Sequence, residues 1–264
     1  MLIIAERINT SRRQIAEAVT AGDRTFIQKE ATAQTEAGAH YIDVNAGTFA
    51  DAEGEKLAWI IEAVQEVTEL PLSIDSPSPA VMRAMLTLVK KTPLINSITL
   101  ESSRIGGILP LVVERKAKVI ALCLAEQGLA ETTAKKVELA GRLIDKLSGA
   151  GVPIDDIYID PLVYPLAVNP GSAQATLGAI GAITRNFPGV HTICGLTNVS
   201  YGLPARKLIN RTFLAAAITQ GLDAAIIDPT DKLLYAMLKA ATLVAGKDSF
   251  CRDYIRTFRE GRLE

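Results

Sequence analysis

Short apolar runs alternate with longer amphipathic stretches along the whole chain. In the stretch 55–69, "EKLAWIIEAVQEVTE", apolar residues recur at i, i+3, i+4 and i+7, which marks the single buried face of a helix. Eight apolar runs separate such stretches and predict eight strands, at 2–9, 41–47, 72–76, 94–98, 119–124, 157–162, 192–198 and 224–230. Regular alternation of strands and helices is typical of a parallel sheet.

The number of units predicts how this sheet is completed. Eight units in 264 residues leave roughly 33 residues for each, close to the length of a strand–loop–helix repeat. We therefore expect an α/β fold of the closed (β/α)8 type, a TIM barrel, with an open doubly wound sheet as the fallback. Because no Ser/Gly/Pro-rich linker interrupts the rhythm, the barrel is expected to be a single domain over residues 1–264.

Residues at several helix ends agree with this division. Ser78 followed by Pro79 predicts an N-cap and a first helical position, and Ser172 predicts a second N-cap. Gly38 is suited to a left-handed helix end before the strand that begins at 41. A last helix is expected within 248–264, with a polar end.

Composition restricts the classes of partner. The hydrophobic content of 48% is typical of a globular protein, and 28 basic against 29 acidic residues give no excess of positive charge for nucleic acid or a membrane surface. No apolar run approaches the roughly 18 residues of a membrane span, and "MLIIAERIN" does not resemble a signal peptide. Three widely spaced cysteines, expected to be free thiols, suit a reducing compartment, so we expect a cytoplasmic protein.

Acids and amides recur where the predicted strands end. One such residue is typically a cap or a turn former. However, Asp and Asn are depleted in strands, and the loops after barrel strands converge on one face. Their recurrence on seven of the eight strands therefore predicts a ring of acceptors and amide donors around one pocket, formed by Glu6, Asn9, Asp43, Asn45, Asp75, Asn96, Asp160, Asn198 and Asp228.

This ring is poorly matched to several ligands. It has little positive charge, and no glycine-rich phosphate loop follows a strand. Its carboxylates come from different strands with no histidine beside them, so no metal site is expected. His40 and His191 begin strands, which places them on the opposite face and excludes a Ser–His–Asp or Cys–His arrangement.

A flat heterocycle with several N–H donors matches the ring better. A carboxylate can accept two parallel hydrogen bonds from an amino-pyrimidinone edge, and amides can serve mixed donor and acceptor positions. The edge of a pterin is such a group. Residue types and positions alone leave a purine and a sugar as alternatives.

The ordered strings "LIIAERIN", "IDVNAG", "IDS", "INS", "YIDPL", "GLTNVS", "LINRTFL" and "GLDAAIIDP" cover nearly the whole chain. Together they resemble the methyltetrahydrofolate:corrinoid protein methyltransferases of the pterin-binding barrel superfamily. The resemblance implies transfer of a methyl group between N-5 of tetrahydrofolate and the cobalt of a corrinoid (cobalamin) on a separate protein. It also implies a homodimer.

The resemblance further implies roles for individual residues. The family's pterin ligands correspond to Asp75, Asn96 and Asp160, and its mobile asparagine beside the methylated nitrogen corresponds to Asn198. Asp43 and Asn45 would line the same site in a supporting network. Because the "DxHxxG" string of corrinoid-binding modules is absent, the corrinoid is expected to arrive on a partner protein over the open barrel face.

The chain departs from the family at Ala5, commonly glycine, at Thr197, commonly serine, and at the fifth strand end, "LCLAEQG". Arg206, Lys207 and Arg211 either hold the folate tail or partner, or pair with nearby acids at a solvated helix start. Glu6 is expected in an ion pair inside the barrel. Two alternative functions stay open: a condensation like that of dihydropteroate synthase, and a protein that binds folate without catalysis.

Overall fold

Eight parallel strands form the centre of the molecule, and each overlaps one of the predicted apolar runs. The structure is a computed structural model that describes residues 1–263. Its barrel strands are β1 (Leu2–Asn9), β2 (Tyr41–Asn45), β3 (Leu72–Asp75), β4 (Leu94–Ile98), β5 (Lys118–Leu122), β8 (Ile157–Asp160), β9 (His191–Thr192) and β10 (Ala224–Ile227).

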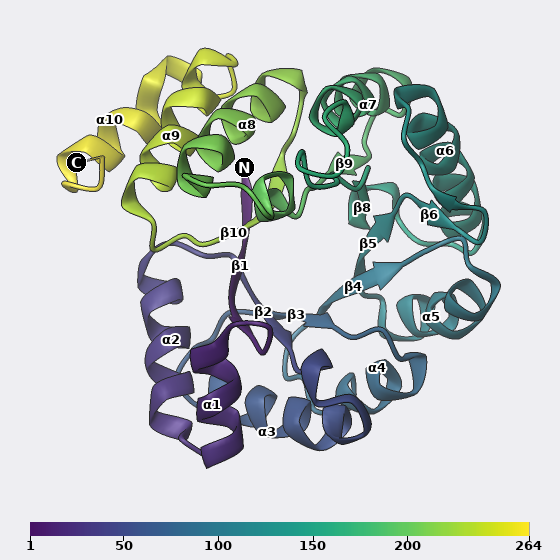
Figure 1. The fold of residues 1–264 in the computed structure, drawn as a ribbon, viewed down its shortest axis with the longest axis vertical. Helices are drawn as coiled ribbons and strands as arrows, with labels where there is room; N and C mark the ends of the chain where they lie inside the picture. Colours follow the sequence, from purple (N-terminus) through teal and green to yellow (C-terminus); the bar gives the residue numbers. More distant parts are fainter. Residues whose placement is uncertain (264) are drawn as a thin grey trace.

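The strands pair in the order β10-β1-β2-β3-β4-β5-β8-β9. A parallel bridge between Gly195 and Ile226 closes the ring just beyond β9, where the Ile226 N–H donates to the Cys194 carbonyl at 3.0 Å. Helices surround this ring in Figure 1. The predicted (β/α)8 barrel is therefore confirmed, and the carboxyl ends of all eight strands share one face.

The outer layer consists of α1 (Arg13–Ala21), α2 (Arg24–Glu36), α3 (Glu53–Gln65), α4 (Pro79–Met85), α5 (Ser102–Arg115), α6 (Thr133–Gly149), α7 (Ser172–Asn186), α8 (Arg206–Gln220), α9 (Lys232–Val244) and α10 (Arg252–Arg259). Four short 3-10 helices are η1 (Gly47–Ala52), η2 (Ile154–Asp156), η3 (Leu196–Ser200) and η4 (Ser249–Cys251). After β5, β6 (Leu124–Ala125) and β7 (Gly128–Leu129) form a small antiparallel hairpin. Among the helices of residues 1–263, none combines the length and the apolar character that a bilayer span needs.

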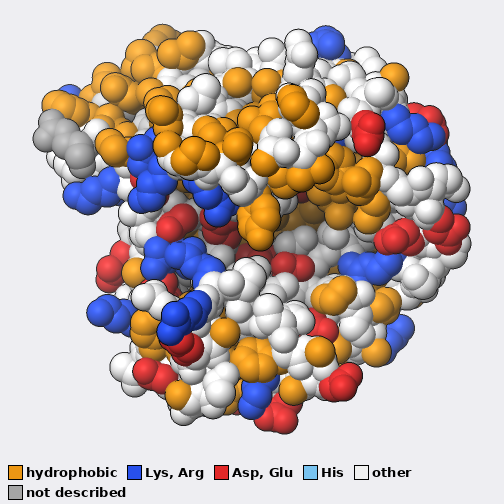
Figure 2. Space-filling model, viewed as in Figure 1, with side chains coloured by type: hydrophobic (Ala, Val, Ile, Leu, Met, Phe, Trp, Pro, Cys, Tyr) orange, Lys and Arg blue, Asp and Glu red, His pale blue; other side chains and the backbone are white. Residues whose placement is uncertain are grey.

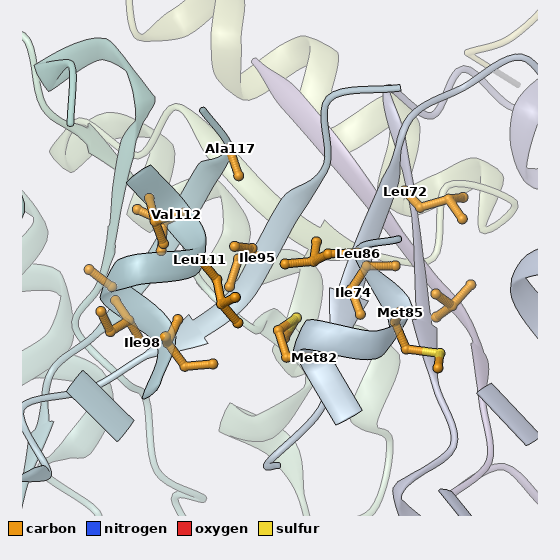
Figure 3. Packing of buried hydrophobic residues seen from close by; sticks show 14 of the residues in the cluster. Leu72, Ile74, Met82, Met85, Leu86, Ile95, Ile98, Leu111, Val112 and Ala117 are labelled. Carbon is orange, nitrogen blue, oxygen red and sulfur yellow. The ribbon is translucent and has the colours of Figure 1, made fainter. Parts of the chain in front are cut away.

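The core lies between the strands and these helices. Figure 3 shows Ile74 of β3 and Ile95 of β4 packed with Met82 of α4 and Leu111 of α5. All four side chains are almost completely buried, which contributes about 1.5–3 kcal/mol each. This packing fixes neighbouring strands relative to each other, and so fixes the side chains at their carboxyl ends.

Two of the predicted helix ends are confirmed. The Ser78 hydroxyl accepts the Val81 N–H at 3.3 Å, with Pro79 as the first residue of α4. Gly38, two residues after the end of α2, has a φ of 91°, in the left-handed region that glycine tolerates and other residues rarely adopt.

Other boundaries differ from the prediction. Helix α3 spans Glu53–Gln65 instead of 55–69, since two acids in its first turn favour an earlier start. Ser172 is the first residue of α7, not its cap, because its hydroxyl accepts the Tyr164 N–H at 2.7 Å and so ties the loop after β8 to this helix.

The end of the chain carries the predicted last helix, followed by a polar end. Within 248–264 the α-helix covers only Arg252–Arg259, and Gly261 has a left-handed φ of 67° two residues after it. Glu264 lies outside the described residues. All three cysteines are free thiols: Cys123 and Cys194 are buried, and Cys251 is exposed in η4.

The amino ends of the strands carry both histidines, as predicted. His40 Nδ1 accepts the Ile3 N–H at 3.1 Å directly before β2. His191 begins β9, and its Nδ1 lies 2.6 Å from Asp223 Oδ2, a contact that raises the pKa of the imidazole. These contacts anchor the face opposite to the candidate site.

Candidate active site

Strand register brings four of the predicted site residues together. Asp43 and Asn45 are two residues apart on β2, so they share one face of the strand. Parallel pairing places Asp43 beside Ser73 and Asn45 beside Asp75 of β3. Accordingly, Ser73 Oγ donates to Asp43 Oδ1 at 2.6 Å, and Asn45 Nδ2 donates to Asp75 Oδ2 at 2.9 Å.

Asn96 joins this network from β4. Its Nδ2 donates to Asp43 Oδ1 at 3.2 Å, although β3 lies between the two strands. Such a contact is expected in a closed barrel, because alternate strands contribute side chains to the same interior layer. Hydrogen bonds therefore join Asp43 to Ser73 and Asn96, and separately join Asn45 to Asp75, while the pairing of β2 with β3 holds the two sets side by side.

Asp160, the last residue of β8, is buried and held differently. Its Oδ1 accepts the Leu162 N–H at 2.7 Å, and its Oδ2 accepts the Gly195 N–H at 3.3 Å. Both donors are backbone groups from the segments that follow β8 and β9. Each carboxylate oxygen keeps acceptor capacity for a ligand.

The position of Asn198 corrects the sequence prediction. The run 192–198 was expected to be one strand, but β9 ends at Thr192 and Asn198 lies in η3 with its side chain exposed. After the bridge at Gly195 the backbone turns, and the Asn198 N–H donates to the Gly195 carbonyl at 3.3 Å. Asn198 Nδ2 would be 3.4 Å from a Cβ at Gly195, so it lies beside the donor to Asp160.

Glu6 lies between these two groups of residues. Its Oε2 accepts from Thr197 Oγ1 at 3.3 Å, and its charge affects the pKa of Asp43. The expected ion pair of Glu6 is wrong: the neighbouring Arg7 pairs with Glu30 at 2.6 Å and Asp228 at 2.9 Å. Among the described residues, Glu6 therefore has no ion-pair partner, since the nearest cation along the chain is held by other acids.

Burial dominates the electrostatics of the acids. It raises the pKa of Asp160 to about 6 and, together with the nearby Asp228, that of Glu6 to about 7. Burial also raises the pKa of Asp43, and burial with the charge of Asp43 raises that of Asp75. Figure 2 shows acidic side chains within a hollow at the centre of the molecule. Groups that donate hydrogen bonds are therefore strongly favoured as ligands of this hollow.

Basic residues near the mouth are used within the chain. Lys207 and Arg211 lie 3.1 and 2.8 Å from the carboxylate of Asp231. The guanidinium of Arg206 donates to the Thr197 carbonyl at 2.8 Å and to Ser200 Oγ, so it supports η3. The interpretation as a helix start paired with acids fits Lys207 and Arg211. Within residues 1–263 there is no cluster of three His, Cys, Asp or Glu side chains suited to a metal ion.

Two contributors were missed in the sequence. Ser73, in "LSIDS", is two residues before Asp75 on an apolar strand, and that spacing placed it on the same face. Lys136 contacts the loop that begins at Pro161, yet it resembled any other lysine of a helix. No local pattern distinguished it, because its burial depends on the packing of α6.

The sequence of this barrel was compared with those of known protein families, and one family matches most of the chain. A family model described as "Pterin binding enzyme" matches residues 5–228. The chain belongs to the pterin-binding enzyme family. This confirms the resemblance drawn from its sequence strings.

Individual relatives narrow the comparison. The chain is 36% identical over 265 residues to a methylcorrinoid:tetrahydrofolate methyltransferase of Eubacterium limosum, and the match covers 100% of this chain and 98% of the relative. It is 33% identical over 240 residues to a methionine synthase of Mycobacterium tuberculosis, across 86% of this chain but only 20% of that protein.

Solved structures agree on the fold. A dihydropteroate synthase of Xanthomonas albilineans superposes with a TM-score of 0.70 at 20% identity, covering 94% of this chain and 92% of that one. A 7,8-dihydropteroate synthase of Vibrio fischeri also gives 0.70, at 15% identity, with 93% of each chain covered. At these identities the likeness concerns the barrel alone.

Proposed function

We propose that this protein is a methyltransferase that moves a methyl group between N-5 of tetrahydrofolate and the cobalt of a corrinoid carried by a separate protein. The full-length match to a methylcorrinoid:tetrahydrofolate methyltransferase carries this proposal. That relative's name gives the direction that we propose here, from the methylated corrinoid to tetrahydrofolate. Tetrahydrofolate and the corrinoid protein are then the two substrates.

Asp75, Asn96 and Asp160 bind the pterin ring in this proposal. Ionised Asp160 keeps free lone pairs while two backbone N–H groups hold it, so it suits the paired N–H donors of an amino-pyrimidinone edge. Asp43 and Asn45 contribute by fixing the partners: Asp43 holds the amide of Asn96, and Asn45 holds Asp75. A prearranged set of this kind loses little freedom when the ligand binds.

Asn198 acts on the reacting nitrogen in this proposal. In the proposed direction the N-5 lone pair bonds to the methyl carbon, the cobalt–carbon bond breaks with its electrons left on cobalt, and N-5 releases a proton to water or to a neighbouring carboxylate. The amide of Asn198 orients N-5 and stabilises the partial charge on it in the transition state. Its exposed position at the mouth leaves room for the partner to approach.

A substitution at Asn198 tests the assignment. For Asn198→Ala we expect the Kd for tetrahydrofolate in calorimetry to change less than threefold, while the methyl-transfer rate falls about 100-fold, the usual effect of removing one hydrogen bond that stabilises the transition state. The visible spectrum of the corrinoid reports the transfer, started from either methylated substrate. Wild-type protein that binds tetrahydrofolate but transfers nothing in either direction would instead indicate a folate-binding protein without catalysis.

The alternative enzymatic function is that of a dihydropteroate synthase. Only the similarity of the barrel fold supports it. A phosphate-bearing pterin substrate needs free cations near the last strands. Lys207 and Arg211, which precede β10, are held by Asp231, and Arg7 is held by Glu30 and Asp228. These pairings argue against that alternative.

The corrinoid protein is proposed to dock beside η3. Val168, Tyr201 and Leu208 are 79%, 66% and 67% exposed in the segments around it. Figure 2 shows hydrophobic side chains gathered along this side of the hollow. An exposed apolar surface next to a reactive site is typical of a protein interface.

For the proposed homodimer we infer a contact surface on α9, formed by other residues than those proposed for the corrinoid protein. Leu233, Met237 and Val244 are exposed at helical spacing on α9 and form an apolar stripe. Sedimentation that gives the monomer mass of 28.2 kDa would count against a dimer. The three free thiols support the proposed cytoplasmic location, and the near-neutral charge supports the absence of nucleic acid among the partners.

A further inference from the structure

Lys136 is a completely buried lysine on α6, with 0% of its surface exposed. Its ammonium forms no ion pair within residues 1–263. Instead it donates to the carbonyls of Pro161, at 2.7 Å, and Leu162, at 2.6 Å, and lies 5.2 Å from the ring centroid of Tyr164. Burial of a lysine disfavours its charged form, and accordingly the pKa of Lys136 is lowered. Because burying a charged lysine is unfavourable, we looked for the contacts that its ammonium stabilises.

The two carbonyls belong to the turn that directly follows Asp160. Leu162 has a φ of 57°, a left-handed conformation that is rare for a residue with a branched side chain. In this conformation the Leu162 N–H donates to Asp160 Oδ1 at 2.7 Å while the Leu162 carbonyl faces Lys136. The ammonium and the carboxylate thus hold opposite sides of one turn.

Lys136 is also the charged group that faces Asp160. The thiols of Cys123 and Cys194 lie near both residues, but burial raises their pKa values so that they stay neutral. Burial likewise raises the pKa of the Tyr164 hydroxyl to about 12, with a smaller effect of Glu131, which is exposed. The ammonium of Lys136 therefore lowers the pKa of Asp160, against the larger effect of burial.

We propose that Lys136 is a positioning residue for folate recognition: it holds the Pro161–Leu162 turn and, through this turn, orients the Asp160 carboxylate. The inference rests on the proposed function, in which Asp160 accepts hydrogen bonds from the pterin. Lys136 itself does not touch the ligand, because it lies behind the turn.

Lys136→Met tests this role, because methionine fills similar space without charge or donors. We expect the Kd for tetrahydrofolate at pH 7 to rise about tenfold. The pH at which binding is half lost should move up from near 6 by about one unit, as expected when an opposite charge near a carboxylate is removed. Calorimetry from pH 5 to pH 8 measures both. The control is Lys135→Met, which removes a half-exposed lysine paired with Glu138 and should change neither value.

Lys136→Gln serves if Lys136→Met does not fold, since its amide keeps N–H donors for the two carbonyls and removes the charge. Lys136→Arg keeps the charge and should return the pH midpoint of binding toward that of the wild type. A folded Met or Gln variant with the wild-type midpoint and affinity would overturn the inference. Reduced thermal stability with an unchanged midpoint would also overturn it, because that is the signature of a purely structural lysine. If the wild type binds no tetrahydrofolate, the proposed function fails instead.

Discussion

Two walls of the barrel mouth hold their polar groups in different ways. The strand wall consists of Asp43, Asn45, Ser73, Asp75 and Asn96 on β2, β3 and β4. The loop wall consists of Asp160, the last residue of β8, and of Leu162, Gly195 and Asn198 in the segments that follow β8 and β9. These walls lie on opposite sides of the ring, since β3 and β9 are four strands apart among eight.

On the strand wall, side chains hold each other because register places them side by side. On the loop wall, backbone N–H groups hold the carboxylate, and buried helix residues such as Lys136 hold the backbone. The strand wall is therefore rigid by construction and suited to recognition. The loop wall combines an anchored acid with an exposed amide, which suits a step that a second protein must reach.

The largest expected effect breaks the strand wall. Asp75→Ala removes a proposed acceptor for the pterin and leaves Asn45 without its partner, so the Kd for tetrahydrofolate should rise about 100-fold. Calorimetry at pH 7 measures the change. Asp51→Ala, at an exposed acid of η1, is the matched control. If the Asp75 variant bound tetrahydrofolate with wild-type affinity, the strand wall would not be part of the binding site.

A smaller effect concerns the stability of the loop wall. The pKa of Asp160 rises from 3.8 unfolded to about 6 folded, so the folded state binds the extra proton, and the stability that this proton gives is lost as pH rises through that window. Asp160→Asn is free of this dependence. Its free energy of unfolding relative to the wild type should therefore increase by about 1 kcal/mol between pH 5 and pH 8.

Urea denaturation of the proteins without ligand at both pH values checks this expectation. The same variant should bind tetrahydrofolate at least tenfold more weakly, because an amide cannot accept two N–H donors as the carboxylate does. A stability difference that does not vary with pH would show that Asp160 has an ordinary pKa in the folded protein.

The smallest effect concerns the apolar edge of the loop wall. Tyr201→Ala should raise the KM for the methylated corrinoid protein about fivefold, since truncation of a tyrosine in an interface often weakens it by about 1 kcal/mol. The Kd for tetrahydrofolate should stay unchanged, which separates docking from recognition. Phe250→Ala is the control, because Phe250 is 86% exposed in η4, away from η3. If both variants had the same KM for the methylated corrinoid protein, docking beside η3 would be contradicted.

The strand wall could be predicted in outline and the loop wall only in part. Asp43, Asn45, Asp75 and Asn96 follow apolar runs, so their places at strand ends were readable. Asn198 was expected to end a strand, but the chain leaves the sheet after Thr192 and continues as η3. An apolar run shows that a segment is buried, without showing whether it is paired along its whole length.

The sequence by itself determined the eightfold alternation, the barrel and the face on which acids and amides gather, because side-chain period and strand number are local properties. Tertiary structure alone decided which of these groups touch. Hydrogen bonds from Ser73 to Asp43, from Asn96 across β3, and from Lys136 to the turn after Asp160 join residues 25 to 53 positions apart. Such contacts depend on strand register and on the docking of α6, which arise only when the ring has closed.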